Sequence, residues 1–299
     1  MKINIIYVNN GVGLTRDAGV IMEALPHCDF NLIDIYKPSL IRNADINIFL
    51  EVVDPQFQNF KLAPINYYIP NPEWYSFAWD KHLHNFDAVL CKTHDTERIF
   101  KSKGCKTIFT SFTSNDRHIE FIDKQKLYLH SAGQSDTKGT MSLYSHWLKS
   151  TGLTELILMK HKAQLQSTDS ISVIPNRMDE DEFKILQNFC GVHICPSQYE
   201  GFGHYINEAR STGAIIITTG AAPMNELVSD EYGYFLPVKS KSPMSLATLQ
   251  NFDPTYLDGI INTIEGLTDK EMSDKSRASR QAFVENDIFF KKQIKQIIK

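Results

Sequence analysis

The chain of 299 residues carries 31 lysines and arginines against 35 aspartates and glutamates, and the resulting net charge of −4 excludes bulk attraction to nucleic acid. Apolar residues make up 42% and charged residues 22%, as in globular proteins, and no run of eighteen apolar residues predicts a membrane span. Five cysteines without a Cys-x-x-Cys pair favour reduced thiols and a cytoplasmic location.

Short apolar runs alternate with polar or helical segments in the first part of the chain. Helical patterns at Ala18–Leu25 and Asp95–Ser102 follow the first and the fifth of these runs. Strands alternating with helices indicate β-α-β units and a parallel sheet. The predicted strands are Ile3–Val8, Phe30–Ile35, Ile46–Leu50, Ile65–Ile69, Ala88–Cys91 and Thr107–Thr110.

The same alternation restarts after a polar segment, Thr113–Lys126, which we interpret as an interdomain linker. The sequence therefore predicts an α/β fold with two Rossmann-like doubly wound domains, residues 1–118 and 119–283, facing a cleft that holds the ligand. The predicted strands of the second domain are Leu127–His130, Leu156–Lys160, Ile171–Ile174, Val192–Cys195 and Ile215–Thr218, and its helices are Met141–Leu148, Glu182–Phe189 and Tyr205–Ser211.

The last residues, 284–299, include a basic amphipathic helix with Phe289, Phe290, Ile294 and Ile297 or Ile298 on its apolar side. We expect this helix to pack on the first domain, with peripheral membrane contact as the alternative. The sequence does not predict an oligomeric state.

Two patterns resemble metal sites but have simpler explanations. Cys190, His193 and Cys195 lie in an apolar strand, which favours burial in the core over metal ligation. Asp179 and Asp181 spell Asp-x-Asp, but they precede a helical pattern, where acidic residues cap the N-terminus. No metal site is expected.

The most informative stretch is SQYEGFGHYINEARSTG, in which a glycine turn separates Glu200 from Glu208. Gly201 and Gly203, on either side of Phe202, let a backbone approach a ligand, and the following helix N-terminus attracts a diphosphate. Helical rise would place the two carboxylates about 12 Å apart. A nucleotide sugar spans that distance, with its transferred sugar on Glu200 and its ribose on Glu208.

These residues resemble the E-x7-E motif of retaining glycosyltransferases with the GT-B fold, family 4 type (glycosyl transferases group 1). The stretch LYLHSAGQSDTKGT resembles the family's Gly-Arg…Lys-Gly segment, with Lys138 in the lysine place and Gln134 where arginine is usual. PNRMDEDEF, with Arg177, resembles the segment that passes the base. The specific match covers roughly 110 residues of the C-terminal half.

The resemblance implies metal-independent transfer from a nucleotide diphosphate sugar, with UDP favoured over GDP and no obligatory cofactor. It places Glu200 and Lys138 in catalysis. It implies a glycan, a lipid-linked sugar or a small molecule as acceptor, and a nucleic-acid acceptor is disfavoured. The donor-binding residues it implies are Gly11, Gly13, Gln134, Lys138, Arg177, Glu200, Gly201, Phe202, Gly203 and Glu208.

In the first half, NNGVGLTRDAG resembles the family's glycine-rich loop, whereas Arg16 in the third glycine's place breaks a dinucleotide fingerprint. In IPNPEWYSFAW, Asn71 and Glu73 are acceptor-side candidates, with Glu73 also a catalytic candidate, and Trp74 is a sugar-stacking surface or a buried residue of a rigid turn. The strand ends add further candidates, for each of which a solvent-facing loop position is the alternative: Glu51, Asp54, Lys92, Thr93 and the acceptor-side candidate His94.

Four other functions compete with transfer. One of them, a nicotinamide-dependent oxidoreductase, is disfavoured by the broken glycine fingerprint. A nucleotide-sugar epimerase of the same fold would need no acceptor, and a binding module would keep the nucleotide site without turnover. A glycoside hydrolase using Glu200 and Glu208 is disfavoured, because the two carboxylates of such enzymes lie about 5 to 9.5 Å apart, closer than the separation of about 12 Å expected here from helical rise.

Overall fold

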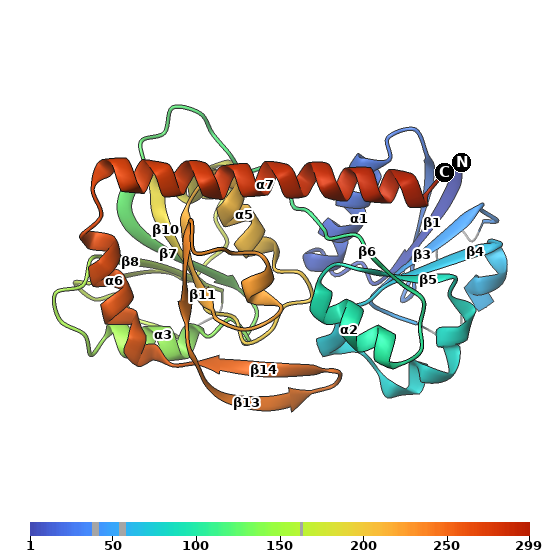
Figure 1. The fold of residues 1–299 in the computed structure, drawn as a ribbon, viewed down its shortest axis with the longest axis horizontal. Coiled ribbons are helices and arrows are strands. Elements are labelled where there is room, and N and C mark those ends of the chain that lie inside the picture. The colour runs from blue at the N-terminus through green and yellow to red at the C-terminus, as the bar shows by residue number, and fades with distance from the viewer. Residues whose placement is uncertain (38–41, 54–57, 162–163) are drawn as a thin grey trace. The chain divides into compact units, whose positions relative to one another are not determined.

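The computed structural model describes residues 1–37, 42–53, 58–161 and 164–299. The chain divides into two compact units, each built on its own parallel sheet (Figure 1). Unit 1 comprises Met1–Ser114, Pro243–Thr248 and Asn286–Lys299. Unit 2 comprises Asn115–Ser242 and Leu249–Glu285.

Unit 1 is a six-stranded parallel sheet in the order β2-β1-β3-β4-β5-β6. Strands β1, β3 and β5 are buried along almost their whole length, as expected for a parallel sheet that is covered on both faces. The strands are β1 (Lys2–Tyr7), β2 (Asp29–Asp34), β3 (Ile46–Leu50), β4 (Ile65–Ile69), β5 (Ala88–Cys91) and β6 (Thr107–Phe109), joined by helices α1 (Gly13–Ala24) and α2 (His94–Ser102) and by 3-10 helices η1 (Gln58–Leu62), η2 (Pro72–Trp74) and η3 (Phe77–Asn85).

Four asparagines run across this sheet, one on each of β2, β1, β3 and β4, at paired positions. The amide of Asn31 donates to Asn4 at 3.1 Å, that of Asn4 to Asn47 at 2.9 Å, and that of Asn47 to Asn66 at 2.8 Å. The Asn66 amide in turn donates to the carbonyl of Phe60 at 3.3 Å. This asparagine ladder supplies the partners that buried polar groups require.

Unit 2 contains a second six-stranded parallel sheet, in the order β12-β11-β10-β7-β8-β9. Its helices connect successive strands, as expected for β-α-β units. The strands are β7 (Gln125–Gly133), β8 (Leu156–Lys160), β9 (Ile171–Ile174), β10 (Cys190–Cys195), β11 (Ile215–Thr219) and β12 (Gly233–Leu236), and the helices are α3 (Thr140–Trp147), α4 (Glu180–Phe189), α5 (His204–Thr212), η4 (Met224–Glu226), η5 (Pro254–Tyr256) and α6 (Leu257–Glu265).

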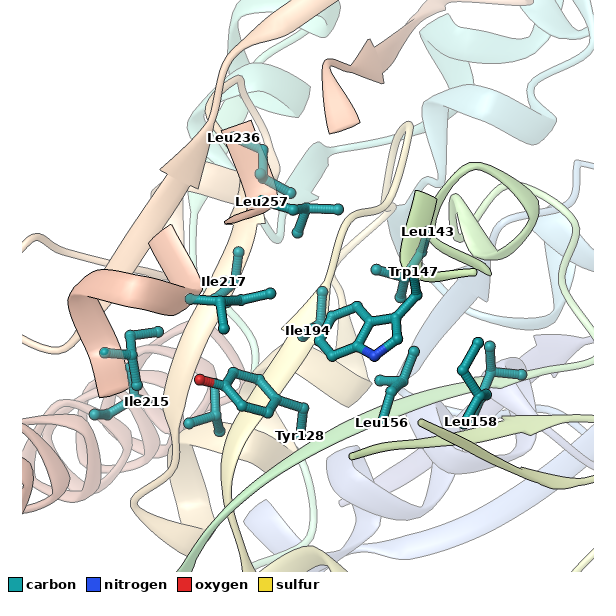
Figure 2. Close-up of a cluster of buried hydrophobic side chains, with 14 of the residues drawn as sticks. Tyr128, Leu143, Trp147, Leu156, Leu158, Ile194, Ile215, Ile217, Leu236 and Leu257 are labelled. Carbon is teal, nitrogen blue, oxygen red and sulfur yellow. The ribbon is translucent and has the colours of Figure 1, made fainter. Parts of the chain in front are cut away.

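The core of unit 2 is a cluster of fully buried side chains around Trp147. Figure 2 shows the indole of Trp147 beside Ile194 and Leu156, with the ring of Tyr128 nearby. The centroids of the Tyr128 and Trp147 rings lie 5.7 Å apart, a separation that favours aromatic contacts. This core fixes β7 and β10, whose carboxyl ends carry the site described below.

Two elements contribute residues to both units. A two-stranded hairpin, β13 (Val238–Met244) and β14 (Ala247–Phe252), has its tip in unit 1. Helix α7 (Asp269–Ile297) begins in unit 2, and its last residues belong to unit 1, where the ring of Phe290 packs against that of Phe112 with centroids 4.8 Å apart and a tilt of 57°. Among the described residues, none of the helices is both long and apolar enough to cross a membrane.

The structure confirms the strands predicted from sequence to within three residues at each end. The predicted helices are also present, although α1 begins at Gly13 instead of Ala18. The apolar side of the C-terminal helix is buried at Phe290, Ile294 and Ile298, whereas Phe289 is 37% exposed. The sequence did not predict β12, the β13–β14 hairpin, α6 or the first half of α7.

Candidate functional site

The candidate site of unit 2 lies at the carboxyl ends of its two central strands. β7 and β10 are neighbours, while β8 and β9 extend the sheet on one side and β11 and β12 on the other. Ligands of open α/β sheets bind at such a switch point. The loop after β7 carries Lys138, and the loop after β10 carries Glu200.

Lys138 and Glu200 form an ion pair in which the ammonium contacts Oε1 of the carboxylate. The hydroxyl of Ser197 donates to the same oxygen and therefore accepts the proton of the Tyr205 phenol. Burial raises the pKa of Tyr205 well above its usual value, so the phenol stays a donor. Lys138 also lies over the Tyr205 ring, 4.1 Å from its centroid. Two catalytic candidates from the sequence, Lys138 and Glu200, are therefore in direct contact.

Gly139 lets the Lys138 loop come this close to the β10 loop. Its backbone is left-handed, with φ of 69°, and a Cβ atom at this position would lie 2.4 Å from the carbonyl oxygen of Pro196. A second tie joins the two loops, because the N–H of Gln198 donates to the carbonyl of Thr137 at 2.8 Å. Only glycine fits this approach without a shift of the backbone.

We expect Gly139→Ala to lower the free energy of unfolding by about 2 kcal/mol, since the left-handed conformation disfavours a side chain and Pro196 must move. Urea unfolding measures this change. The matched variant Gly259→Ala lies in helix α6, where an added Cβ meets nothing within 4 Å. Its stability should not fall, and an equal loss in both variants would contradict the role of Gly139.

Helix α5 brings Glu208 to this end of the sheet. Gly203, with φ of 101°, precedes the helix, which has no side-chain cap and no acidic residue in its first turn. Its first N–H groups and its positive dipole end therefore suit an anion. Glu208 is buried and accepts a hydrogen bond from the amide of Gln187 at 3.2 Å.

The separation of about 12 Å expected for Glu200 and Glu208 from helical rise rests on a wrong premise. Helix α5 begins at His204, so Glu200, Gly201, Phe202 and Gly203 are not helical. Helical rise therefore applies to only half of the interval. Gly201, Phe202 and Gly203 are all buried in the turn between the two glutamates.

Gln134, which stands where arginine was expected, lies in the loop after β7 beside a buried lysine. The ammonium of Lys160 binds the carbonyls of Gln134 and Ser135 at 3.1 and 2.7 Å and the carboxylate of Asp136 at 2.8 Å. Lys160 thereby fixes the loop that leads to Lys138. Arg177 is exposed in the loop between β9 and α4.

The candidates of unit 1 also lie at a switch point, since β1 is flanked by β2 and β3. Gly11 is exposed in the loop after β1, and Gly13 is exposed as the first residue of α1. Gly11 has φ of 68°, and its N–H donates to the hydroxyl of Thr15 at 2.9 Å. The loop is thereby folded onto the first turn of α1.

A chain of polar side chains joins the ends of β3, β4 and β5 to α1. Lys92 donates to Asp17 at 2.6 Å and to Asn71 at 3.0 Å, and Asn71 donates to Glu51 at 2.7 Å. Glu51 has the left-handed φ of 65°, a strained conformation for this residue. Burial raises the pKa of its carboxyl, although the bond from Asn71 opposes this effect. Asn71 thus belongs to a fixed polar cluster.

The other candidates of the first half are distributed along the same unit, except Asp54, which lies outside the described residues. Glu73 and Trp74 lie in η2, and Trp74 is 57% exposed, which excludes the alternative of a buried tryptophan. The hairpin tip holds this turn, because the N–H of Leu246 donates to the carbonyl of Pro72 at 3.2 Å. His94 is exposed, stacks on Phe109 with centroids 3.8 Å apart and contacts Glu97 at 3.2 Å.

The patterns that resembled metal sites are structural. Cys190, His193 and Cys195 are buried, as predicted, and burial lowers the pKa of His193 to about 4. Asp179 caps α4, since its carboxylate accepts from the N–H of Asp181 at 2.9 Å. The sequence analysis missed Ser197, Tyr205 and Lys160 as neighbours of the site; the Ser and Tyr positions flanking the glycine turn were the available signal.

The two units resemble solved glycosyltransferase structures over the whole chain. A glycosyltransferase from Rickettsia africae has a TM-score of 0.72 at 13% identity, with 100% of this chain and 98% of that chain covered. Anabaena Alr3699/HepE, solved in complex with UDP, has a TM-score of 0.71 at 16% identity, with 100% and 99% covered. Sucrose-phosphate synthase from Thermosynechococcus elongatus has a TM-score of 0.70 at 12% identity, with 100% and 98% covered. The expected fold class is confirmed: this is the α/β architecture of GT-B glycosyltransferases.

Within that class the family is defined by sequence. The family model of glycosyl transferases group 1 matches residues 96–249, just over half of the chain. The protein therefore belongs to glycosyl transferases group 1. No curated protein matches the sequence.

Proposed function

We propose that the protein transfers a sugar from a nucleotide diphosphate sugar to an acceptor with retention of anomeric configuration, as a family 4 type enzyme. The observation that carries this proposal is the Lys138–Glu200 pair beside the uncapped N-terminus of α5, with Glu208 on the same helix. A UDP-sugar is the favoured donor, since Alr3699/HepE was solved with UDP and with UDP-glucose. A GDP-sugar is the second choice.

The roles of the residues follow from their chemistry. An ammonium has three donors, so Lys138 can bind phosphate oxygens while it holds Glu200. Glu200 would accept hydroxyls of the transferred sugar, the glycine turn and helix N-terminus would hold the diphosphate, and Glu208 would hold the ribose. Gly11, Gly13, Gln134 and Arg177 complete the proposed donor contacts, by analogy with the family.

In the proposed reaction the acceptor oxygen attacks the anomeric carbon on the face that the phosphate leaves. The bond from that carbon to the phosphate oxygen breaks, and the departing phosphate takes the acceptor's proton. Lys138 and the helix N-terminus would stabilise the charge that develops on the phosphate. No metal is then required, and transfer should persist in excess EDTA.

For the acceptor side we propose residues 1–118, with Asn71, Glu73, Trp74 and His94 in contact with the acceptor. Trp74 presents an exposed aromatic face of the kind that sugars stack on. Asn71 is held by Lys92 and Glu51, so its position is fixed before a ligand binds. The acceptor would be a glycan, a lipid-linked sugar or a small molecule, and the proposed compartment is the cytoplasm.

A thermal-shift screen of UDP-, GDP-, ADP- and dTDP-sugars tests the proposal, because a ligand that binds the native state raises the melting temperature. We expect one nucleotide class to stabilise the wild type by several degrees and Glu208→Ala much less. No shift with any nucleotide would overturn the proposed function. Product analysis then separates transfer from epimerisation, since an epimerase converts the donor without an acceptor.

A further inference from the structure

Gln187, on helix α4, lies between a buried cation and the Glu208 carboxylate. Its side chain is 1% exposed. Its Oε1 accepts from Nε of Arg117 at 2.8 Å, and its Nε2 donates to Oε2 of Glu208 at 3.2 Å. The amide thus connects two charged groups on different elements.

The chemistry of the three groups fixes the direction of this chain. A guanidinium is a donor only, and an ionised carboxylate is an acceptor only. The side chain between Arg117 and Glu208 must therefore accept at one end and donate at the other. Glutamine does both, whereas glutamate or methionine at position 187 could not.

Arg117 is itself held, so it can act as a fixed anchor. Arg117 is 6% exposed. Its NH1 group pairs with the Glu180 carboxylate, and its NH2 group donates to the backbone carbonyl of Glu180 at 3.3 Å. Its backbone N–H donates to the hydroxyl of Ser211 at 3.0 Å. Gln187 has a further tie, because its backbone carbonyl accepts from Nε2 of His193 at 2.9 Å.

We propose that Gln187, oriented by Arg117, is a positioning residue that aims the Glu208 carboxylate at the ribose of the donor and so makes the site select ribonucleotides. This inference rests on the proposed function. A charge-assisted hydrogen bond of this kind restricts where the bonded carboxylate oxygen lies. Two ribose hydroxyls can then meet a carboxylate that does not have to reorient.

Calorimetric titration of the full chain with UDP, GDP and ADP, each paired with its 2′,3′-dideoxy counterpart, measures this selection. For the ribonucleotide that binds, we expect the wild type to bind the dideoxy form about 10- to 100-fold more weakly, the range of charge-assisted hydrogen bonds. We compare variants by the ratio of the Kd of the dideoxynucleotide to the Kd of the ribonucleotide. In Glu208→Ala this ratio should fall to near one.

Gln187→Met keeps the volume and helix propensity of the side chain but cannot donate to Glu208. We expect its ratio to fall to within about threefold through weaker ribonucleotide binding, while dideoxynucleotide binding is unchanged. The matched control is Leu186→Ala, on the same helix, whose side chain packs against the apolar cluster of Leu129, Met159 and Cys190. It should lose stability yet keep the wild-type ratio.

Arg117→Lys keeps a cation for Glu180 but lacks the Nε donor, so its ratio should fall as well. It keeps the test decisive if Gln187→Met does not fold. Wild-type protein that binds none of the nucleotides would refute the proposed function. Suppose that the wild type and Glu208→Ala behave as expected, but that the folded Gln187→Met and Arg117→Lys variants keep the wild-type ratio. The positioning role would then be refuted, and the proposed function would stand.

Discussion

Replacing Lys138 with methionine is expected to lower kcat/KM for sugar transfer by about 10²- to 10³-fold, the loss seen when a group that stabilises developing charge is removed. Under the proposed mechanism Lys138 supplies the only side-chain cation that we place on the leaving diphosphate. Its removal also leaves the Glu200 carboxylate, 8% exposed, with Ser197 but without its cation. Nucleotide release with the donor found by thermal shift provides the measurement.

The control for this variant is Lys126→Met, at the amino end of β7. Lys126 is also a half-buried lysine, and it donates to the carbonyls of Glu265 and Leu267 at 3.0 and 2.7 Å. It lies at the opposite end of the strand from the Lys138 loop. We expect its activity to stay within a few-fold of the wild type, and a Lys138→Met enzyme that retained a tenth of wild-type kcat/KM would contradict the assigned role.

Lys92→Met is expected to lower the free energy of unfolding by about 3–5 kcal/mol, the usual loss when one partner of a buried ion pair is removed. The Lys92 and Asp17 side chains are only 2% and 4% exposed, and their charged atoms are 2.6 Å apart. The variant leaves the Asp17 carboxylate buried without its cation. Urea unfolding followed by tryptophan fluorescence would report the loss, since Trp74 and Trp79 lie in unit 1 and Trp147 lies in unit 2.

Two further variants separate this effect from a general loss of charge. Lys101→Met removes a lysine that is 60% exposed from its pair with Glu97, and surface pairs contribute less than about 1 kcal/mol. The double variant Lys92→Met/Asp17→Leu should recover much of the stability, since a buried pair replaced by apolar residues is often tolerated. A double variant no more stable than Lys92→Met would show that the ion pair is not the cause.

The strands of both sheets except β12, and the helices between them, were predictable because apolar runs bounded by polar turns leave few alternatives for parallel strands. The first half of α7, from Asp269, was missed because it is polar and lacks a continuous apolar stripe. The β13–β14 hairpin was missed because β13 is mostly polar and contains Pro243, which is unfavourable within a strand. In both cases tertiary contacts supply what local pattern does not.

For the site, the residues within continuous motifs were predictable, whereas the contacts between residues far apart in the sequence were not. Glu200, Glu208 and Lys138 were found by their spacing and by resemblance, because all three belong to continuous motifs. Their contacts were not predictable. Gln187 meets Glu208 across 21 positions, and Lys138 meets Glu200 across 62, so both pairings depend on the order of the strands in the sheet.

The asparagine ladder of unit 1 has a consequence for how that sheet assembles. Apolar side chains alone would tolerate a strand displaced by two residues, because the same face would still point inward. Such a slip would leave the amides of Asn4 and Asn47 without partners in the core, at a loss of several kcal/mol. The ladder thus selects the native strand register. The free-energy cost of a misaligned pairing is larger than the stability that the ladder's hydrogen bonds contribute to the native sheet. The ladder also couples β1 to β4, so that these strands should form as a single cooperative step.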